Sequence, residues 1–296
     1  MNHQQEESNS REKAKGFWMR YRSRTINTGR HTIILAFLVC VYAILAGCEN
    51  VPAFLPGQVT GTPPKKFTTL PPGSPLPSES ECAARVRYSS FEPRPQNYTA
   101  NHRVPTAQQI ANLALWNVSI GLNSRADSLR RQITGSFTGT TDEILQWVAC
   151  KWGIDEDIVR AEAHAESTWY QSTTGDFSTR RKLCPPGTWN GSGCYQSYGI
   201  LQIKYIYNKS AWPMSRDDTA FSAEYMYGIL RTCYEGWTSY LGQRRSLPGY
   251  PNYQAGDIWG CVGRWFSGNW YDQEAIDYIA KVKTDYANKD WLKPGF

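Results

Sequence analysis

Residues 155–170 read DEDIVRAEAHAESTWY, and residues 197–203 read SYGILQI. In the first stretch, Asp155 can cap a helix whose opening acidic residues favour its N-terminus, and the chain predicts a helix that continues to about Ser167. Glu166 then lies in the last turn, where the helix dipole disfavours a negative charge. We therefore expect this carboxyl to stay protonated more readily than an ordinary glutamate.

The composition and charge of the whole chain limit the possible partners. Its 296 residues suffice for one large domain or two small ones. The net charge of +6 is uneven, because residues 1–47 hold seven Lys/Arg and three Asp/Glu. The remainder is nearly balanced and has no basic stripe that stands clear of acids, so no nucleic-acid partner is expected.

An apolar run from Ile33 to Gly47 follows the basic segment and ends in Leu-Ala-Gly before Cys48. Such a run suits the core of a signal peptide better than a membrane-spanning helix, which needs about 20 residues. The L-A-G-C ending resembles the bacterial lipobox, in which Cys48 would be lipidated and become the mature N-terminus. The alternative is a type II signal anchor with an incidental cysteine. Both place residues 49–296 outside the cytoplasm, anchored at a membrane.

Residues 48–81 are rich in Pro, Thr, Ser and Gly, a composition that favours an extended tether over a packed core. Residues 82–296 are expected to form one domain, with its core at about 140–286. We predict an α+β, predominantly α-helical domain, in which Ser215 and Asp218 form a capping box before one of the helices. The predicted helices cover 105–121, 141–152, 158–167, 219–234, 257–265 and 272–286, and strands are expected only between 170 and 203.

Six cysteines follow the tether, and an even number in an exported domain implies disulfides. The short loop between Cys184 and Cys194 makes these two the favoured pair. Zinc is the competing interpretation, but no C-x-x-C or paired histidine spacing supports it, so no metal is expected. The remaining pairs then follow by elimination as Cys233–Cys261 and Cys82–Cys150.

The residues after the tether offer little support for catalysis by a histidine-bound metal or by a serine nucleophile. Only His102 and His164 are histidines there, and His164 is two positions before Glu166, on nearly the opposite helix face. No G-x-S-x-G nucleophile motif occurs. Glu166 is the remaining candidate, and the aromatic residues Trp169 and Tyr170 that follow are expected to raise its pKa by burial. No cofactor is expected.

Glu166-Ser167, together with the segment Ser197-Tyr198-Gly199-Ile200-Leu201-Gln202-Ile203, resembles the soluble lytic transglycosylase family of lysozyme-like domains, which is related to goose-type lysozymes. Those domains combine E-S, S-x-x-G-x-x-G-L-M-Q and Y-N-x-G elements. The resemblance covers roughly 142–286. It implies a lysozyme-like fold that cleaves the MurNAc–GlcNAc bond of peptidoglycan.

The resemblance also assigns roles to residues. Glu166 would be the general acid and base, and Ser167 would support it. The Y-N-x-G position holds Trp265-Phe266-Ser267-Gly268, so Tyr271 or Tyr278 would have to replace the family's tyrosine. Aromatic candidates for stacking on sugars are Trp169, Trp189, Trp265 and Trp270. The other residues expected to contact substrate are Ser197, Gly199, Ile200 and Gln202.

The reaction outcome depends on how many carboxylates take part. A transglycosylase needs one acid and yields 1,6-anhydro ends, whereas a hydrolase usually needs a second carboxylate to activate water. Asp176 is the preferred second group, because goose-type lysozymes place an acid in this loop. Glu162, four residues before Glu166 on the same helix face, is expected to be solvated or salt-bridged. A further alternative is a non-catalytic lipoprotein that binds wall glycan. Peptidoglycan is the expected partner of a monomeric protein.

Overall fold

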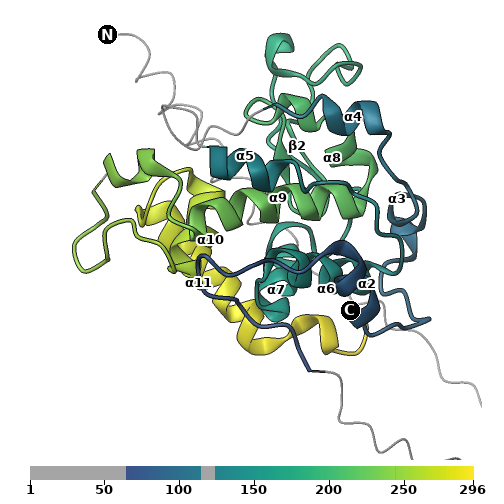
Figure 1. The fold of residues 1–296 in the computed structure, drawn as a ribbon. Coiled ribbons are helices and arrows are strands. Elements are labelled where there is room, and N and C mark those ends of the chain that lie inside the picture. The colour runs from purple at the N-terminus through teal and green to yellow at the C-terminus, as the bar shows by residue number, and fades with distance from the viewer. Residues whose placement is uncertain (1–64, 115–123, 244) are drawn as a thin grey trace, which may run out of the picture. The chain divides into compact units, whose positions relative to one another are not determined.

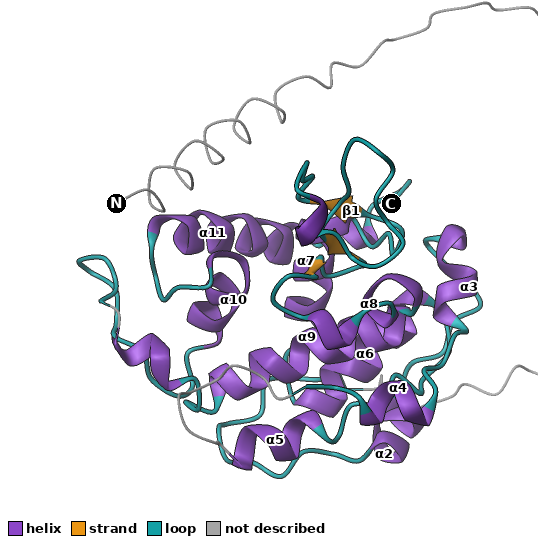
Figure 2. Cartoon of the chain, turned by 90° about the horizontal axis from the view of Figure 1, so that it is seen from above, coloured by secondary structure: helices purple, strands orange, loops and turns teal. Residues whose placement is uncertain are grey.

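The computed structural model describes residues 65–114, 124–243 and 245–296, all within one compact unit, Val59–Phe296. The unit is mostly helical and contains one small sheet, as expected for a predominantly α-helical α+β protein (Figures 1 and 2). The predicted signal segment, Cys48 and the first part of the tether lie outside the described residues. Within the part that the structure describes, no helix has the length and apolar character to cross a membrane.

The small sheet is antiparallel, in the order β1-β2-β3. Its strands are β1 (Thr174–Gly175), β2 (Ser197–Tyr198) and β3 (Ile203–Lys204), so all begin within the region where strands are predicted. The described α-helices are α2 (Glu79–Arg85), α3 (Tyr98–Asn101), α4 (Ala107–Ala111), α5 (Ser124–Arg130), α6 (Thr141–Trp152), α7 (Glu156–Ser167), α8 (Met214–Asp217), α9 (Thr219–Tyr234), α10 (Ile258–Ser267) and α11 (Gln273–Asn288).

Helix α9 forms the centre of the core, because every one of its residues is buried. Helices α5, α6, α8 and α10 all pack against it. A helix that is covered on all sides needs mainly apolar or paired residues, and most of the side chains of α9 are of these kinds. Helix α7 packs against both α6 and α11, so its last turn lies near a helix from the far end of the chain.

The predicted helices α6, α7, α9, α10 and α11 are confirmed to within two residues at each end. Their caps explain the agreement. At α6, Thr140 Oγ1 accepts from the Glu143 amide at 3.3 Å, and Glu143 Oε2 accepts from the Thr140 amide at 2.9 Å. This reciprocal pair satisfies two amides that would otherwise lack partners at the helix start.

Two predictions about helix bounds are wrong, one about a capping residue and one about where a helix ends. Before α9, Asp218 alone caps the helix by accepting from the Phe221 amide at 2.7 Å, because Ser215 belongs to the short helix α8. The helix predicted over 105–121 is much shorter, since α4 is capped by Thr106 and ends at Ala111. The last part of that predicted range lies outside the described residues.

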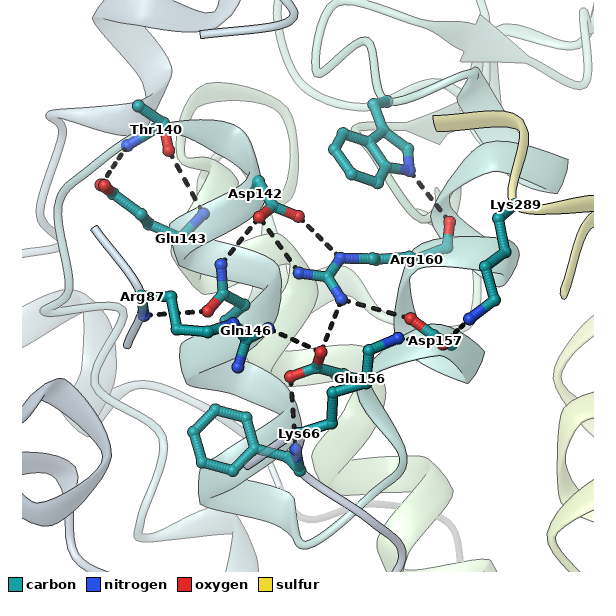
Figure 3. A network of polar contacts seen from close by, with 12 residues as sticks. Lys66, Arg87, Thr140, Asp142, Glu143, Gln146, Glu156, Asp157, Arg160 and Lys289 are labelled. Atoms are coloured by element: carbon teal, nitrogen blue, oxygen red, sulfur yellow. Dashed lines mark hydrogen bonds and ion pairs between the residues drawn. The ribbon is translucent and has the colours of Figure 1, made fainter. Parts of the chain in front are cut away.

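A buried ionic network fixes α7 against α6 (Figure 3). The Arg160 guanidinium donates from Nε and Nη2 to the two carboxylate oxygens of Asp142 on α6, at 2.7 and 3.0 Å. Its Nη1 donates to Glu156 at 2.8 Å, and Glu156 also accepts from Arg87 at 2.6 Å. A two-pronged contact of this kind sets orientation as well as distance, so α7 is held in a defined rotation.

The end of the predicted tether is part of the folded unit. Phe67 is buried, and the amide of Leu70 donates to Gly153 O at 3.0 Å. The buried Arg231 donates to the carbonyls of Leu70 and Pro71, both at 3.0 Å. Folded contacts therefore begin before Cys82, because a buried arginine recruits proline-rich backbone that composition alone assigns to a linker.

All three predicted cysteine pairs are disulfides in the structure. Cys82–Cys150 joins α2 to α6, and Cys233–Cys261 joins α9 to α10. Cys184–Cys194 closes the loop between β1 and β2. The first two fasten elements around the core, and the third fixes a surface loop.

Candidate active site

Glu166 lies in the last turn of α7, where the Tyr278 hydroxyl on α11 donates to its Oε1 at 2.6 Å. Tyr278 itself is buried. Of the two tyrosines proposed to replace the family's hydroxyl, Tyr278 is therefore the one at this carboxyl. The hydroxyl of Tyr271 instead contacts Asp257 at 3.0 and 3.1 Å.

The surroundings of Glu166 suit a proton donor. Burial raises the pKa of its carboxyl to about 7, while the hydrogen bond from Tyr278 and the charge of Lys281 act in the opposite direction. The charge of Asp176 adds to the increase. A carboxyl with a pKa near 7 can both give and take a proton at neutral pH, which an ordinary glutamate cannot do efficiently.

Ser167 joins the two halves of the sequence motif. Its hydroxyl lies 3.1 Å from Ala163 O and 2.8 Å from Ile200 O, so it reaches from α7 to the G-I-L-Q segment. Gly199 adopts φ = 86°, and a Cβ there would lie 2.3 Å from Ser215 O. Only glycine fits this position, and the close approach seats the segment against α8 and α9.

The side chain of Gln202 forms hydrogen bonds with backbone carbonyls of the site. Its Nε2 donates to Thr173 O at 3.0 Å and to Gly199 O at 2.8 Å. These two bonds connect the segment that follows α7 to the turn before β3. Its amide donors are thus occupied within the protein, and Gln202 shapes the site from within.

Three residues expected to contact substrate, Trp169, Ile200 and Trp270, lie in the core. Trp169 is 1% exposed, and its indole N–H donates to Arg160 O at 2.9 Å. Ile200 is fully buried. The prediction that these side chains line a groove is wrong, because the turn after α7 and the turn between β2 and β3 place them in the hydrophobic core. The stacking candidate Trp270 is also 1% exposed, whereas Trp189 and Trp265 are half-buried.

Asp176 is exposed and lies between β1 and the disulfide loop. Its Oδ2 accepts from the hydroxyl of buried Ser197 at 2.5 Å and pairs with Lys204 Nζ at 3.2 Å. Ser197 therefore orients this carboxylate from below the surface. Since Asp176 acts on the titration of Glu166, both acids belong to one electrostatic site.

Glu162 is fully buried, so the expectation that it is solvated or salt-bridged is wrong. Its Oε2 accepts from the Tyr227 hydroxyl at 2.7 Å, and its Oε1 has no hydrogen-bond partner. Burial raises the pKa of this carboxyl well above its ordinary value, and the charge of Glu166 adds to the effect. Two glutamates one turn apart on α7 therefore each accept a hydrogen bond from a tyrosine, Glu162 from Tyr227 on α9 and Glu166 from Tyr278 on α11.

Replacing Glu162 by Gln should change how stability depends on pH. The stability contributed by the neutral acid is complete below pH 4.5 and is lost as pH rises through the raised pKa. The free energy of unfolding of Glu162→Gln should therefore improve relative to wild type between pH 5 and pH 9. Urea unfolding at both pH values measures this change, with Glu274→Gln on the surface of α11 as the control. A difference that is the same at both pH values would contradict the assignment.

Sequence reasoning missed Phe266 as part of this site. Its ring stacks on that of Tyr278 with centroids 4.7 Å apart and an interplanar angle of 7°, yet 57% of the residue is exposed. Phe266 belongs to the W-F-S-G element at the end of α10. The position of this element, in place of Y-N-x-G, was the sequence feature that could have identified Phe266 as a site residue. It covers the tyrosine that holds Glu166 and faces solvent on its other side.

Replacing Tyr278 by Phe should move the pH dependence of activity. With Glu166 as the general acid expected from the sequence, the rate should fall as pH rises through about 7. Loss of a hydrogen bond that lowers this pKa should shift the fall to higher pH, and the rate at pH 6 should drop about tenfold as Oε1 loses its support. Rate profiles from pH 5 to 9 measure both effects. Tyr286→Phe on the same helix, which packs on Trp259, is the matched control. An unchanged midpoint in Tyr278→Phe would count against the role of this hydroxyl.

Two other features contain no residue of the Glu166 site. Within the described ranges, one group has metal-ligand proximity, namely His164, Asp285 and Asp290. There His164 lies 3.1 Å from Asp285, and Lys293 pairs with Asp290. An open surface hollow is lined by Pro75, Leu76, Pro77, Glu81, Ala84 and Arg85.

Comparison of the chain with protein-family models, curated proteins and solved structures finds no significant match.

Proposed function

We propose that this protein is an exported, membrane-anchored lytic transglycosylase that cleaves the MurNAc–GlcNAc bond of peptidoglycan. The observation that carries the proposal is the Glu166–Tyr278 pair. It places a carboxyl with a pKa of about 7 at a helix end, beside a G-I-L-Q segment that Ser167 holds in place. A lysozyme-like arrangement of the mostly helical domain is part of the same proposal.

In the proposed reaction, one carboxyl acts twice. Protonated Glu166 gives its proton to the glycosidic oxygen as the bond to the anomeric carbon breaks, and the substrate's own N-acetyl group assists at that carbon. The Glu166 carboxylate then takes the proton of the same sugar's 6-hydroxyl while that oxygen bonds to the anomeric carbon. The products are a free 4-hydroxyl and a 1,6-anhydro end, and Glu166 is protonated again.

The surrounding residues support both states of this carboxyl. Burial favours the neutral form that starts the reaction, and the Tyr278 hydroxyl stabilises the anion that follows. The hydrogen bond also fixes the direction of Oε1, so the other carboxyl oxygen is available to face substrate. The opposing influences leave the pKa close to neutrality, where proton donation and recovery are both efficient.

A hydrolytic lysozyme is the second candidate, and Asp176 is the observation that favours it. This carboxylate is exposed, oriented by Ser197 and electrostatically coupled to Glu166. In a hydrolase, Asp176 would take a proton from water as that water attacks the anomeric carbon. Lys204 Nζ lies 3.2 Å from this carboxylate, so a positive charge stands beside the oxygen that would take the proton.

Product analysis in ¹⁸O-labelled water tests the proposal. The full chain, with its disulfides formed, is incubated with purified peptidoglycan, and the released muropeptides are weighed by mass spectrometry. Anhydro ends without ¹⁸O are the expected result. Reducing ends that carry ¹⁸O would replace the proposal by the hydrolase that uses Asp176. If folded protein binds peptidoglycan but releases nothing, the enzymatic proposal is wrong and a binding lipoprotein takes its place.

A further inference from the structure

The connection between β1 and β2, which contains the Cys184–Cys194 loop, presents two aromatic rings to solvent. Phe177 is 55% exposed and Tyr195 is 45% exposed. Their ring centroids are 5.4 Å apart with an interplanar angle of 72°, an edge-to-face contact. In Figure 1 the connection between α7 and α8, which carries this loop, lies at the top of the view, above α9.

The two rings are held in place without being buried. Ser178 and Cys194 exchange backbone hydrogen bonds of 2.8 and 3.0 Å, and Cys194 is also disulfide-bonded to Cys184. The ring of Phe177 lies on Gly193, where a Cβ would come within 2.3 Å of it. The disulfide, the Ser178–Cys194 hydrogen bonds and Gly193 thus fix the two rings in an exposed position, where their apolar surface adds little to the stability of the fold. Fixed exposed aromatic surface of this kind is typical of a binding site.

The pair continues directly from the candidate active site. Phe177 follows Asp176, which is oriented by Ser197 and paired with Lys204, and whose charge acts on Glu166. Polar groups that can hydrogen-bond sugar hydroxyls therefore adjoin an apolar surface that can cover a ring face. This combination suits a pyranose ring, which has apolar C–H faces and a polar edge.

We propose that Phe177 and Tyr195 form a stacking subsite for one sugar ring of the glycan strand, beyond the bond that Glu166 cleaves. The inference rests on the proposed function and adds a preference for long strands. A short oligosaccharide that spans only the cleavage site does not reach the subsite, whereas a long strand gains the additional contact. The subsite lies on the two residues that flank the disulfide loop, in the connection that separates the two halves of the motif.

The test compares the double variant Phe177→Ala/Tyr195→Ala with wild type, using full chains on long and short purified glycan strands. The variant should need about a tenfold higher concentration of long strands for half-maximal rate, which corresponds to about 1.4 kcal/mol of lost stacking free energy. Its rate on short strands should be unchanged. Phe91→Ala, which removes an exposed ring from an unrelated segment, should match wild type on both substrates.

Conservative variants and a fold check keep the result interpretable. Phe177→Trp and Tyr195→Phe retain aromatic faces and should restore the wild-type preference for long strands. Thermal unfolding shows whether the alanine variants remain folded, and if the double variant does not, Tyr195→Ala alone is measured. Equal concentration dependence for wild type and the folded alanine variant would overturn the subsite while leaving the proposed function intact. Absence of any cleavage by wild type would instead overturn the proposed function.

Discussion

Replacing Glu166 by Gln should lower the rate of peptidoglycan cleavage by at least about 10³-fold, because the amide cannot donate the proton that the leaving sugar requires. Gln has the same shape and can still accept the hydrogen bond from Tyr278, so the geometry in which Tyr278 holds Oε1 should persist. The rate is measured as solubilisation of purified peptidoglycan by the full chain at pH 6. Binding of the variant to the same material by co-sedimentation should be close to wild type.

The control for this variant is Glu274→Gln, which removes an exposed carboxyl from the first turn of α11. Its rate should equal that of wild type. Glu166→Gln should also be at least as stable as wild type above pH 7. The stability that wild type draws from a neutral Glu166 is complete below pH 4.5 and is lost as pH rises through about 7. A folded Glu166→Gln protein with more than a tenth of wild-type activity would exclude Glu166 as the acid.

Removing the Cys82–Cys150 disulfide should destabilise the domain by about 4 kcal/mol, the chain-entropy value expected for a closed loop of this length. The bond joins residues 68 positions apart and fastens α2 to α6. For a domain with a total stability of about 5–15 kcal/mol, this is a large fraction. Denaturant unfolding of the Cys82→Ala/Cys150→Ala double variant measures the loss.

The matched control is Cys184→Ala/Cys194→Ala, whose bond closes a loop of only 10 positions at the surface. The chain-entropy value for that loop is smaller, at about 3 kcal/mol or less. The double variant that lacks Cys82–Cys150 should therefore unfold at the lower denaturant concentration. The opposite order, or no loss in either variant, would show that α2 contributes little to the core.

The local chemistry of the chain explains which parts of the fold could be predicted. Helices α6 and α7 are capped by the side chains of Thr140 and Asp155, which directly precede them. Their starts could therefore be predicted from adjacent residues. The failure at 105–121 has the opposite cause, because no local signal ended the predicted helix at Ala111. The proline-rich residues near Leu70 were assigned to a tether because the arginine that binds them, Arg231, is 161 positions away.

In the candidate site, too, features set by adjacent residues could be predicted and features set by distant residues could not. Glu166 could be chosen from its place at a helix end, and Ser167 from its neighbourhood. The hydroxyl that reaches Glu166 comes from Tyr278, 112 positions later, and only the packing of α11 on α7 decides between it and Tyr271. Burial was underestimated for both residues, because Trp169 was expected to line a groove and Glu162 to be solvated or salt-bridged, and the structure buries both. Both are determined by the positions of neighbouring helices rather than by adjacent residues.

The central claim is that Glu166 is the single acid and base of a glycan-cleaving site. One paired digest tests it most directly, in which full-length wild type and Glu166→Gln act on the same peptidoglycan and the released ends are weighed. We predict 1,6-anhydro ends with wild type and none above the enzyme-free background with the variant. Equal release of anhydro ends by both proteins, with the variant freed of contaminating activity, would contradict the account.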